Sequence, residues 1–285
     1  MMTTRRQFLQ TGLVAAAAVM SPGKVLFSQT ATKKAAIPLV LQTYTLRRFG
    51  FDELIRKTRE IGIDEVEIAG GNSFWEGPKR SVALNAEERK RLRSLLADNG
   101  IRAVSLGGCQ GTPQEFDFAK EMGLQFLQGE PPFEELVNVS KRADEYGVRF
   151  ALHNHAKPSK YWDYRENLNR VKDCAEALGF CPDTGHYVRS GFDPLQVIRD
   201  MRGRMVSVHL KDLDITNPEG DSKVKLLDVT WGTGKGQVEA ILRELQNQGF
   251  TGPVVIEYDH IYEDGNVAEV KKCAEFFRKI IGPST

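Results

Sequence analysis

The fold is decided by the stretch VRFALHNH, residues 148–155, in which a short apolar run ends at His153 and His155. The arrangement recurs further along the chain at PDTGH (182–186), SVHLKD (207–212) and VVIEYD (254–259). Parallel β/α proteins place their chemistry at the carboxyl ends of their strands. Because all five histidines fall between residues 153 and 260, we expect one polar site built from four successive strands.

Eight β-rich runs alternate with amphipathic helical patterns. The runs are 37–45, 65–69, 102–106, 125–128, 149–153, 179–183, 205–210 and 254–258. Helical patterns include 52–61, 86–99, 133–146, 165–178, 238–248 and 267–281, and several of them are predicted to end at a glycine, namely Gly62, Gly100, Gly123, Gly147, Gly179 and Gly249. Eight βα units with short αβ turns predict an α/β protein, a single (β/α)₈ TIM barrel over residues 36–285. A doubly wound open sheet rarely repeats so regularly.

The first 35 residues are predicted to be an export signal with a short linker. Thr4–Gln10 reads TRRQFLQ, a twin-arginine pattern, and the apolar run that follows is too short to span a membrane. We therefore expect passage through the twin-arginine translocase to the periplasm, cleavage between Ser28 and Ala36, and no stable membrane anchor after processing. This route carries folded proteins, which suits an enzyme that acquires its metal before export.

Composition excludes some partners and leaves others open. A net charge of +1 supplies no basic field for nucleic acid or for a membrane surface. The four cysteines are scattered without CxxC spacing, so we predict no disulfide among Cys109, Cys174, Cys181 and Cys273. Homo-oligomers are compatible with the sequence, which does not determine the oligomeric state.

One inward-facing residue from each of four neighbouring strands predicts a metal site. The candidate ligands are His153, Asp183, His209 and Glu257. Two nitrogens and two oxygens suit one divalent ion of the Mn²⁺, Co²⁺, Fe²⁺ or Zn²⁺ type better than Ca²⁺ or Mg²⁺.

Long βα connections at 70–85, 154–164 and 211–236 predict the substrate pocket. They contain all three tryptophans, Trp75, Trp162 and Trp231. We expect these side chains to contact a ring-shaped ligand; the alternative is that each packs its loop against the barrel rim.

The segments PDTGH, SVHLKD and VVIEYD, together with the eightfold framework, resemble the xylose isomerase-like TIM-barrel superfamily over residues 37–281. Its members include sugar isomerases and epimerases, inosose dehydratases and apurinic-site endonucleases. The resemblance implies metal ligands at Asp183, His209 and Glu257, with His186 near the substrate or behind the metal and Asp212 orienting His209. The related epimerases carry glutamate where this chain has His153.

The nuclease branch of this superfamily does not fit the residues. It needs further histidines on early strands and an Asp-x-His after strand 7, but this chain has no histidine before residue 153 and Asp212-Leu213-Asp214 is not followed by one. The near-zero net charge also fits DNA poorly.

In the remaining branch, a divalent metal would polarise a ketone and stabilise the charge of an enediolate. Glu257 is the best candidate for the base that removes the proton. Because His153 replaces the second glutamate of the epimerases, the other proton-transfer group has to be His155, His186 or Lys211. His155 could instead bond a loop backbone.

Two further polar residues on early strands, Glu67 and Gln42, would reach into the same pocket, although Glu67 could instead pair with Lys211. The glycine loop 232–236, GTGKG, could cradle a phosphate, but a tight turn before the helix at Gln237 is the favoured interpretation.

The favoured function is a metal-dependent isomerase or epimerase of a non-phosphorylated carbohydrate. A lyase on the same metal, either an inosose-type dehydratase or a keto-glycoside β-eliminase, is the alternative. A barrel that binds carbohydrate without turnover is the third interpretation.

Overall fold

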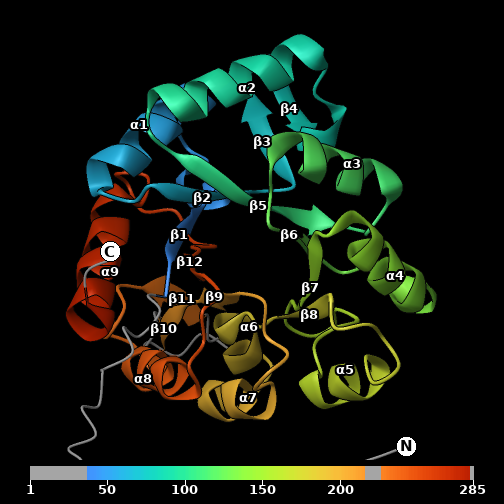
Figure 1. The fold of residues 1–285 in the computed structure, drawn as a ribbon. Helices are drawn as coiled ribbons and strands as arrows, with labels where there is room; N and C mark the ends of the chain where they lie inside the picture. Colours follow the sequence, from blue (N-terminus) through green and yellow to red (C-terminus); the bar gives the residue numbers. More distant parts are fainter. Residues whose placement is uncertain (1–36, 216–225, 283–285) are drawn as a thin grey trace, which may run out of the picture. The chain divides into compact units, whose positions relative to one another are not determined.

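The structure, a computed structural model, describes residues 37–215 and 226–282. The predicted export signal lies outside these residues. Eight parallel strands form one sheet in the order β8-β7-β6-β5-β2-β1-β12-β9 (Figure 1). Their bounds are β1 Leu39–Gln42, β2 Glu65–Ile68, β5 Arg102–Cys109, β6 Phe126–Gly129, β7 Arg149–His153, β8 Leu178–Cys181, β9 Val208–Leu210 and β12 Val254–Ile256. Parallel bridges from Phe180 to Met205 and from Asp183 to His209 join the two ends, so the predicted barrel is confirmed.

Helices on the outside of the strands connect them (Figure 1). They are α1 Phe51–Ile61, α2 Ala86–Asp98, α3 Pro113–Met122, α4 Leu136–Tyr146, α5 Tyr164–Arg170, α6 Thr184–Arg189, α7 Pro194–Asp200, α8 Val238–Gln248 and α9 Val267–Ile281, with 3-10 turns at Thr43–Leu46, Ser81–Ala83 and Phe133–Glu135. Four helices end as predicted at a glycine with positive φ, namely Gly62, Gly123, Gly147 and Gly249.

Two details of the helix prediction are wrong. The helix expected over 165–178 ends at Arg170, and turns follow in which Val171 and Cys174 still face the core, so the apolar spacing persists without the helix. Gly179 is not a helix cap but lies inside β8. A Cβ at this position would stand 2.3 Å from the carbonyl oxygen of Arg204, so glycine is needed where the chain before β9 approaches β8.

Two antiparallel hairpins that were not predicted stand on the long βα connections. One consists of β3 (Gly71–Phe74) and β4 (Gly77–Arg80), and the other of β10 (Asp212–Ile215) and β11 (Leu226–Val229). They explain why these connections are long, and the first of them brings Arg80 to the pocket described below.

The barrel interior is divided into an apolar and a polar layer. The apolar layer consists of Val40, Val104, Phe126, Ala151, Cys181, Val206 and Val255. Strand ends beyond it carry buried polar residues, among them Gln42, Glu67, Ser105 and Gln128. All four cysteines are buried and free. Among the described residues, no helix combines the length and the apolar character needed to cross a membrane.

Candidate metal centre and substrate pocket

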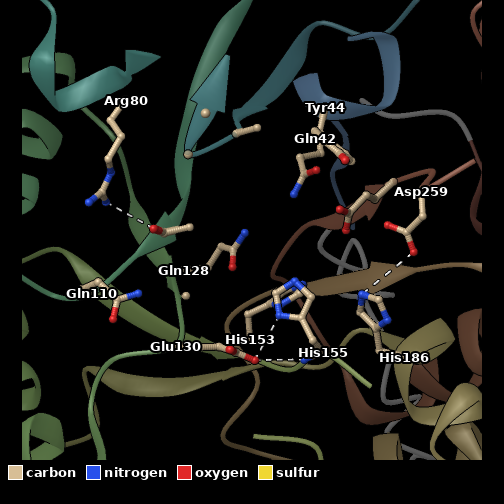
Figure 2. Close-up of a pocket in the computed structure, with 16 residues that line it drawn as sticks. Gln42, Tyr44, Arg80, Gln110, Gln128, Glu130, His153, His155, His186 and Asp259 are labelled. Atoms are coloured by element: carbon tan, nitrogen blue, oxygen red, sulfur yellow. Dashed lines mark hydrogen bonds and ion pairs between the residues drawn. The ribbon is translucent and has the colours of Figure 1, made fainter. Parts of the chain in front are cut away.

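A pocket of about 800 Å³ opens at the carboxyl ends of the barrel strands. Figure 2 shows His153, His155, His186 and Asp259 on one side of it and Arg80 and Gln110 on the other. Glu257 and the exposed ring of Tyr44 also line it. Gln42, Gln128, Glu130 and five small residues, Ala69, Gly70, Gly71, Gly108 and Gly129, complete the lining.

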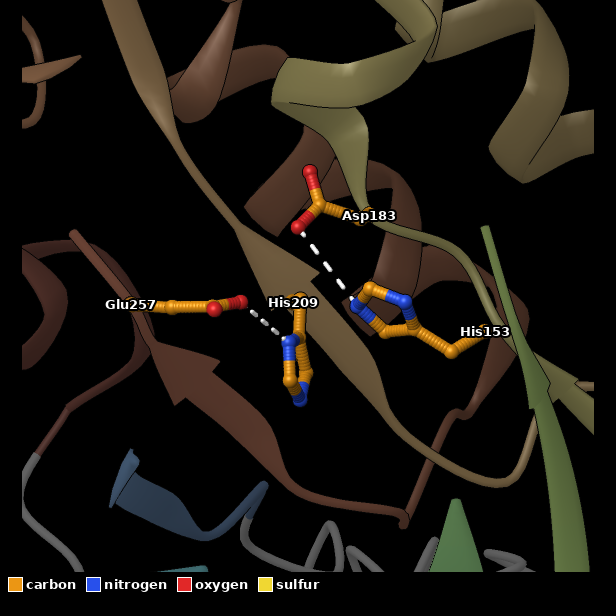
Figure 3. Close-up of side chains that lie close together, drawn as sticks. All are labelled: His153, Asp183, His209 and Glu257. Carbon is orange, nitrogen blue, oxygen red and sulfur yellow. Dashed lines mark hydrogen bonds and ion pairs between the residues drawn. The ribbon is translucent and has the colours of Figure 1, made fainter. Parts of the chain in front are cut away.

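The four predicted metal ligands meet at the base of this pocket. His153 ends β7, Asp183 is the N-cap of α6, His209 lies in β9, and Glu257 follows β12. All four are buried, and one nitrogen or oxygen atom from each lies within 4.8 Å of the others (Figure 3).

The side chains fit a cation. His153 Nε2 is buried and without a hydrogen-bond partner, and it lies 3.7 Å from Asp183 Oδ2. That spacing is too long for a hydrogen bond, but it suits two ligands that each lie roughly 2.0–2.2 Å from one ion. An orphaned buried polar atom is costly, and a cation shared with Asp183 is the simplest partner for this nitrogen. The donor set alone does not distinguish Zn²⁺ from Mn²⁺, Co²⁺ or Fe²⁺.

Glu67, and not Asp212, holds the ring of His209. His209 Nδ1 lies 2.7 Å from Glu257 Oε2, and on the other side of the ring Nε2 lies 2.9 Å from Glu67 Oε1. Glu67 is fully buried and also accepts hydrogen bonds from Gln42, Gln128 and Ser105, which fixes its carboxylate. Burial raises the pKa of Glu67, but the contact with His209 and these hydrogen bonds outweigh it, so the net shift is downward. Metal-binding histidines are usually held by such an outer carboxylate.

Asp212 has a different role from the predicted one. Its buried carboxylate accepts the backbone N–H groups of Gly232 (2.8 Å), Gly234 (3.0 Å) and Gly236 (2.7 Å), and also that of Leu213. The glycine loop therefore cradles an anion, but this anion is a carboxylate of the protein itself. This geometry agrees with the structural interpretation of the loop and leaves these N–H groups no room for a phosphate.

Lys211 is fully buried beside the cluster and does not line the pocket. Its ammonium nitrogen lies 3.0 Å from Asp183 Oδ2, 3.3 Å from Glu257 Oε2 and 2.9 Å from Asp259 Oδ1. Burial lowers the pKa of Lys211, but these three carboxylates raise it well above its ordinary value. The alternative pairing with Glu67 is not formed. Lys211 neutralises charge next to the site instead of reaching the substrate directly.

His155 is held by a carboxylate that sequence reasoning missed. Its backbone N–H and its ring Nδ1 lie 3.0 and 3.1 Å from Glu130 Oε1, which also accepts the hydroxyl of Ser159. The hydrogen bond to Glu130 raises the pKa of His155. The alternative role, a bond from the ring to a loop backbone, is not observed with any described residue. Glu130 directly follows β6, so it occupies the same strand-end position as the metal ligands. That position in the sequence could have predicted Glu130 as a site residue.

His186 lies deeper, with its ring centroid 5.0 Å from that of His155. Burial lowers its pKa to about 4, against the opposing pull of Asp183. His260 lies outside this set, and its ring packs against Tyr262.

The three tryptophans do not line the pocket. Trp75 packs against Phe51 and Phe74, and Trp162 stacks on Phe192. Trp231 is 1% exposed and belongs to the core. Their loops are on the active face as expected, but each ring packs its own loop against the barrel, which was the alternative interpretation. The exposed aromatic ring in the pocket is Tyr44, whose ring stacks on the guanidinium of Arg47 at 3.8 Å.

Eight parallel strands with a buried His/Asp/Glu cluster under a polar pocket define a TIM barrel with a candidate site at the carboxyl ends of its strands. The family of xylose isomerase-like TIM barrels matches residues 132–280. The rhizopine catabolism protein MocC of Rhizobium meliloti is 27% identical over 216 residues, which make up 70% of this chain and 65% of MocC.

An inosose dehydratase of Bacillus thuringiensis is 26% identical over 221 residues, 73% of this chain and 67% of that enzyme. The crystal structure of a xylose isomerase-like TIM-barrel protein from Mycobacterium smegmatis in complex with magnesium superimposes with a TM-score of 0.70 at 14% identity, over 86% of this chain and 97% of that one. The chain belongs to the xylose isomerase-like TIM-barrel family.

Proposed function

We propose that the protein is a metal-dependent enzyme that removes the proton next to the carbonyl of a non-phosphorylated keto sugar or cyclic keto polyol. The observation that carries this proposal is the buried cluster of His153, Asp183, His209 and Glu257 at the base of an open polar pocket. A divalent ion held by these residues supplies Lewis-acid polarisation of a substrate carbonyl.

Glu257 is the proposed base. Its carboxylate lines the pocket, and among the described residues only its Oε2 is engaged by neighbours, namely His209 and Lys211. A carboxylate next to a polarised carbonyl can accept the proton from the adjacent carbon. The nearby Lys211 ammonium favours the charged form of Glu257 before the reaction.

Of the outcomes that follow proton removal, we propose β-elimination, which makes the enzyme a carbon–oxygen lyase. The two proton-transfer groups that we assign differ, because one is a carboxylate, Glu257, and the other is an imidazole, His155, held by Glu130. His155 can donate a proton to the departing oxygen while the C–O bond breaks and a C=C bond forms. The inosose dehydratases among the relatives carry the name of such a reaction.

Isomerisation or epimerisation is the second candidate. The same base, Glu257, would serve this reaction if His155 or His186 donated a proton to carbon instead of to a leaving group. Donation to the opposite face of the same carbon gives an epimer, and donation to the neighbouring carbon gives an isomer. An enzyme of this kind needs no further residue than those already in the pocket.

A screen of keto sugars and inososes in D₂O with metal-reconstituted protein tests both candidates. Loss of water or of an aglycone, read by mass spectrometry, identifies a lyase, and a product of unchanged formula apart from solvent deuterium identifies an isomerase or epimerase. Glu257→Gln should abolish either reaction while the fold persists. If the purified protein binds less than about half an equivalent of divalent metal, or if Glu257→Gln retains activity, the proposal is wrong.

We also propose that the protein is exported by the twin-arginine route. A reporter fused behind residues 1–36 should reach the periplasm, and replacing Arg5 and Arg6 by lysine should retain it inside the cell. Reporter activity unchanged by that double substitution would contradict this route.

A further inference from the structure

The side of the pocket away from the metal ligands contains an unfilled space beside Arg80. Gly71 pairs directly with Arg80 across the β3–β4 hairpin, so both side-chain positions face the same way. A Cβ atom placed on Gly71 would meet no other atom within 4 Å. The space beside the Arg80 side chain is therefore open, and no described side chain fills it.

The wall of this space is backbone. A Cβ on Gly70 would lie 2.7 Å from the carbonyl oxygen of Gly107, and Gly108 has φ +70° with a Cβ position 3.2 Å from the Cα of Gly70. Side chains are excluded at both positions because the backbone between β2 and β3 approaches β5 closely there. The close approach of these backbone segments therefore sets the width of the pocket at this point.

Arg80, whose side chain is half exposed, is anchored through one nitrogen of its guanidinium. Its Nη2 lies 2.5 Å from Oε1 of Glu115, which is 1% exposed, and 3.3 Å from the carbonyl oxygen of Gly108. Glu115 is itself held by the backbone N–H groups of Gln110 and Thr112 at the start of α3. Nη1 of Arg80 has no partner among the described residues. The guanidinium thus presents unused donors to the pocket while its charge is balanced by Glu115.

A charge-balanced donor on the same side of the pocket as Gln110 favours an uncharged, hydroxyl-rich group over an anion. Figure 2 shows Arg80 and Gln110 across the pocket from His186 and Asp259. The pocket volume of about 800 Å³ lies in the upper part of the range of roughly 300–1,000 Å³ found for sites that hold drug-sized molecules. A single sugar ring at the metal cluster would leave the Arg80 side empty.

We propose that this region, formed by Gly71, Arg80 and Gln110, is a second subsite that binds a second uncharged sugar ring, so that the substrate is a keto sugar linked to another sugar. This inference rests on the proposed function, because the first ring is the one placed at the metal cluster. Arg80 and Gln110 donate hydrogen bonds to hydroxyl groups of the second ring, and Gly71 provides its space.

Calorimetric binding to the metal-reconstituted protein tests the subsite without any turnover. The probes are cellobiose, maltose and sucrose, each compared with methyl glucoside, and a glucuronic acid-containing disaccharide as the charged counterpart. At least one uncharged disaccharide should bind about tenfold more tightly than the single ring, the gain expected from one hydrogen bond to a charged group. Gly71→Trp, which fills the open space, and Arg80→Gln should each bring this affinity ratio close to one.

Matched variants separate the subsite from general damage. Gly71→Ala adds one methyl group into open space and should keep most of the ratio, and Arg80→Lys should keep part of it. Thermal unfolding shows whether each variant is folded. The proposal would be overturned if methyl glucoside and the uncharged disaccharides bound with equal affinity, or if no disaccharide bound. An unchanged affinity ratio in folded Gly71→Trp would also overturn it. A gain seen only with the glucuronic acid probe would overturn the assignment of an uncharged ring. If the keto-sugar screen fails but the ratio behaves as expected, the reaction is wrong and the subsite stands.

Discussion

Replacing Asp212 by asparagine should destabilise the barrel strongly. The Asp212 carboxylate is buried and accepts four backbone N–H groups, two on each oxygen, at 2.7–3.0 Å. Asparagine keeps one acceptor oxygen and turns an NH₂ group toward the other two N–H donors. Hydrogen bonds to a charged group contribute about 1.5–3 kcal/mol each, and an unsatisfied buried donor costs about 1–3 kcal/mol. Because water can reach part of a loosened loop, we expect a net loss of about 3–5 kcal/mol.

Urea unfolding followed by tryptophan fluorescence measures this loss, and Trp231, which precedes the loop, serves as a local probe. The matched control is Asp163→Asn, because Asp163 caps α5 by accepting a single N–H from Arg165 and asparagine caps equally well. The free energy of unfolding of that variant should lie within about 0.5 kcal/mol of the parent value.

The anchoring role is refuted if the free energy of unfolding of Asp212→Asn lies within about 1 kcal/mol of the parent value while its metal affinity falls more than about tenfold. Asp212 would then orient His209.

Three further predictions concern the charges and the packing around the site. Glu67→Gln should lower the affinity for divalent metal about 10–100-fold in a chelator competition, because Glu67 holds His209; an unchanged affinity would remove that role. Lys211→Met should raise the metal affinity at least about tenfold, since it removes an ammonium 3.0 Å from a ligand oxygen, whereas the same change at the exposed Lys235 should have no effect. Gly129→Ala should destabilise the protein by at least about 3 kcal/mol or prevent folding, because its Cβ would lie 2.0 Å from a backbone oxygen. Gly50→Ala adds a methyl group into open space, so its free energy of unfolding should lie within about 1 kcal/mol of the parent value.

The barrel and the metal ligands were predictable because neighbouring parallel strands all end at the same rim of the barrel. A histidine or carboxylate that ends a buried strand must lie at the same rim as those of the neighbouring strands. His153, Asp183, His209 and Glu257 all obey this rule, and their buried side chains do meet. The helix-ending glycines at 62, 123, 147 and 249 were predictable for an equally local reason, the left-handed conformation at a helix end.

The loops were not predictable in the same way, because their side chains are directed by contacts between distant residues. Tryptophans in loops on the active face are typical of a sugar-binding surface. Trp75 and Trp162 instead pack on aromatic neighbours in their own region of the fold. Arg80 reaches the pocket only because a hairpin forms between residues 71 and 80 and because Glu115 holds the guanidinium. Asp212 stands close to His209 in sequence, but its side chain turns to the glycine loop.

His153 distinguishes the chemistry of this site from that of a site with glutamate at the same position. Its Nε2 faces Asp183, so under the proposed function the ring would serve as a ligand and would offer no carboxylate to remove a second proton. The cluster then holds two carboxylates, Asp183 and Glu257, one of whose charges is balanced by the ammonium of Lys211. A divalent ion held in these surroundings would keep more of its positive charge than among three carboxylates, and would polarise a carbonyl more strongly. In the proposed elimination, Glu257 would then be the carboxylate base, and the imidazole of His155 would donate a proton to the departing oxygen.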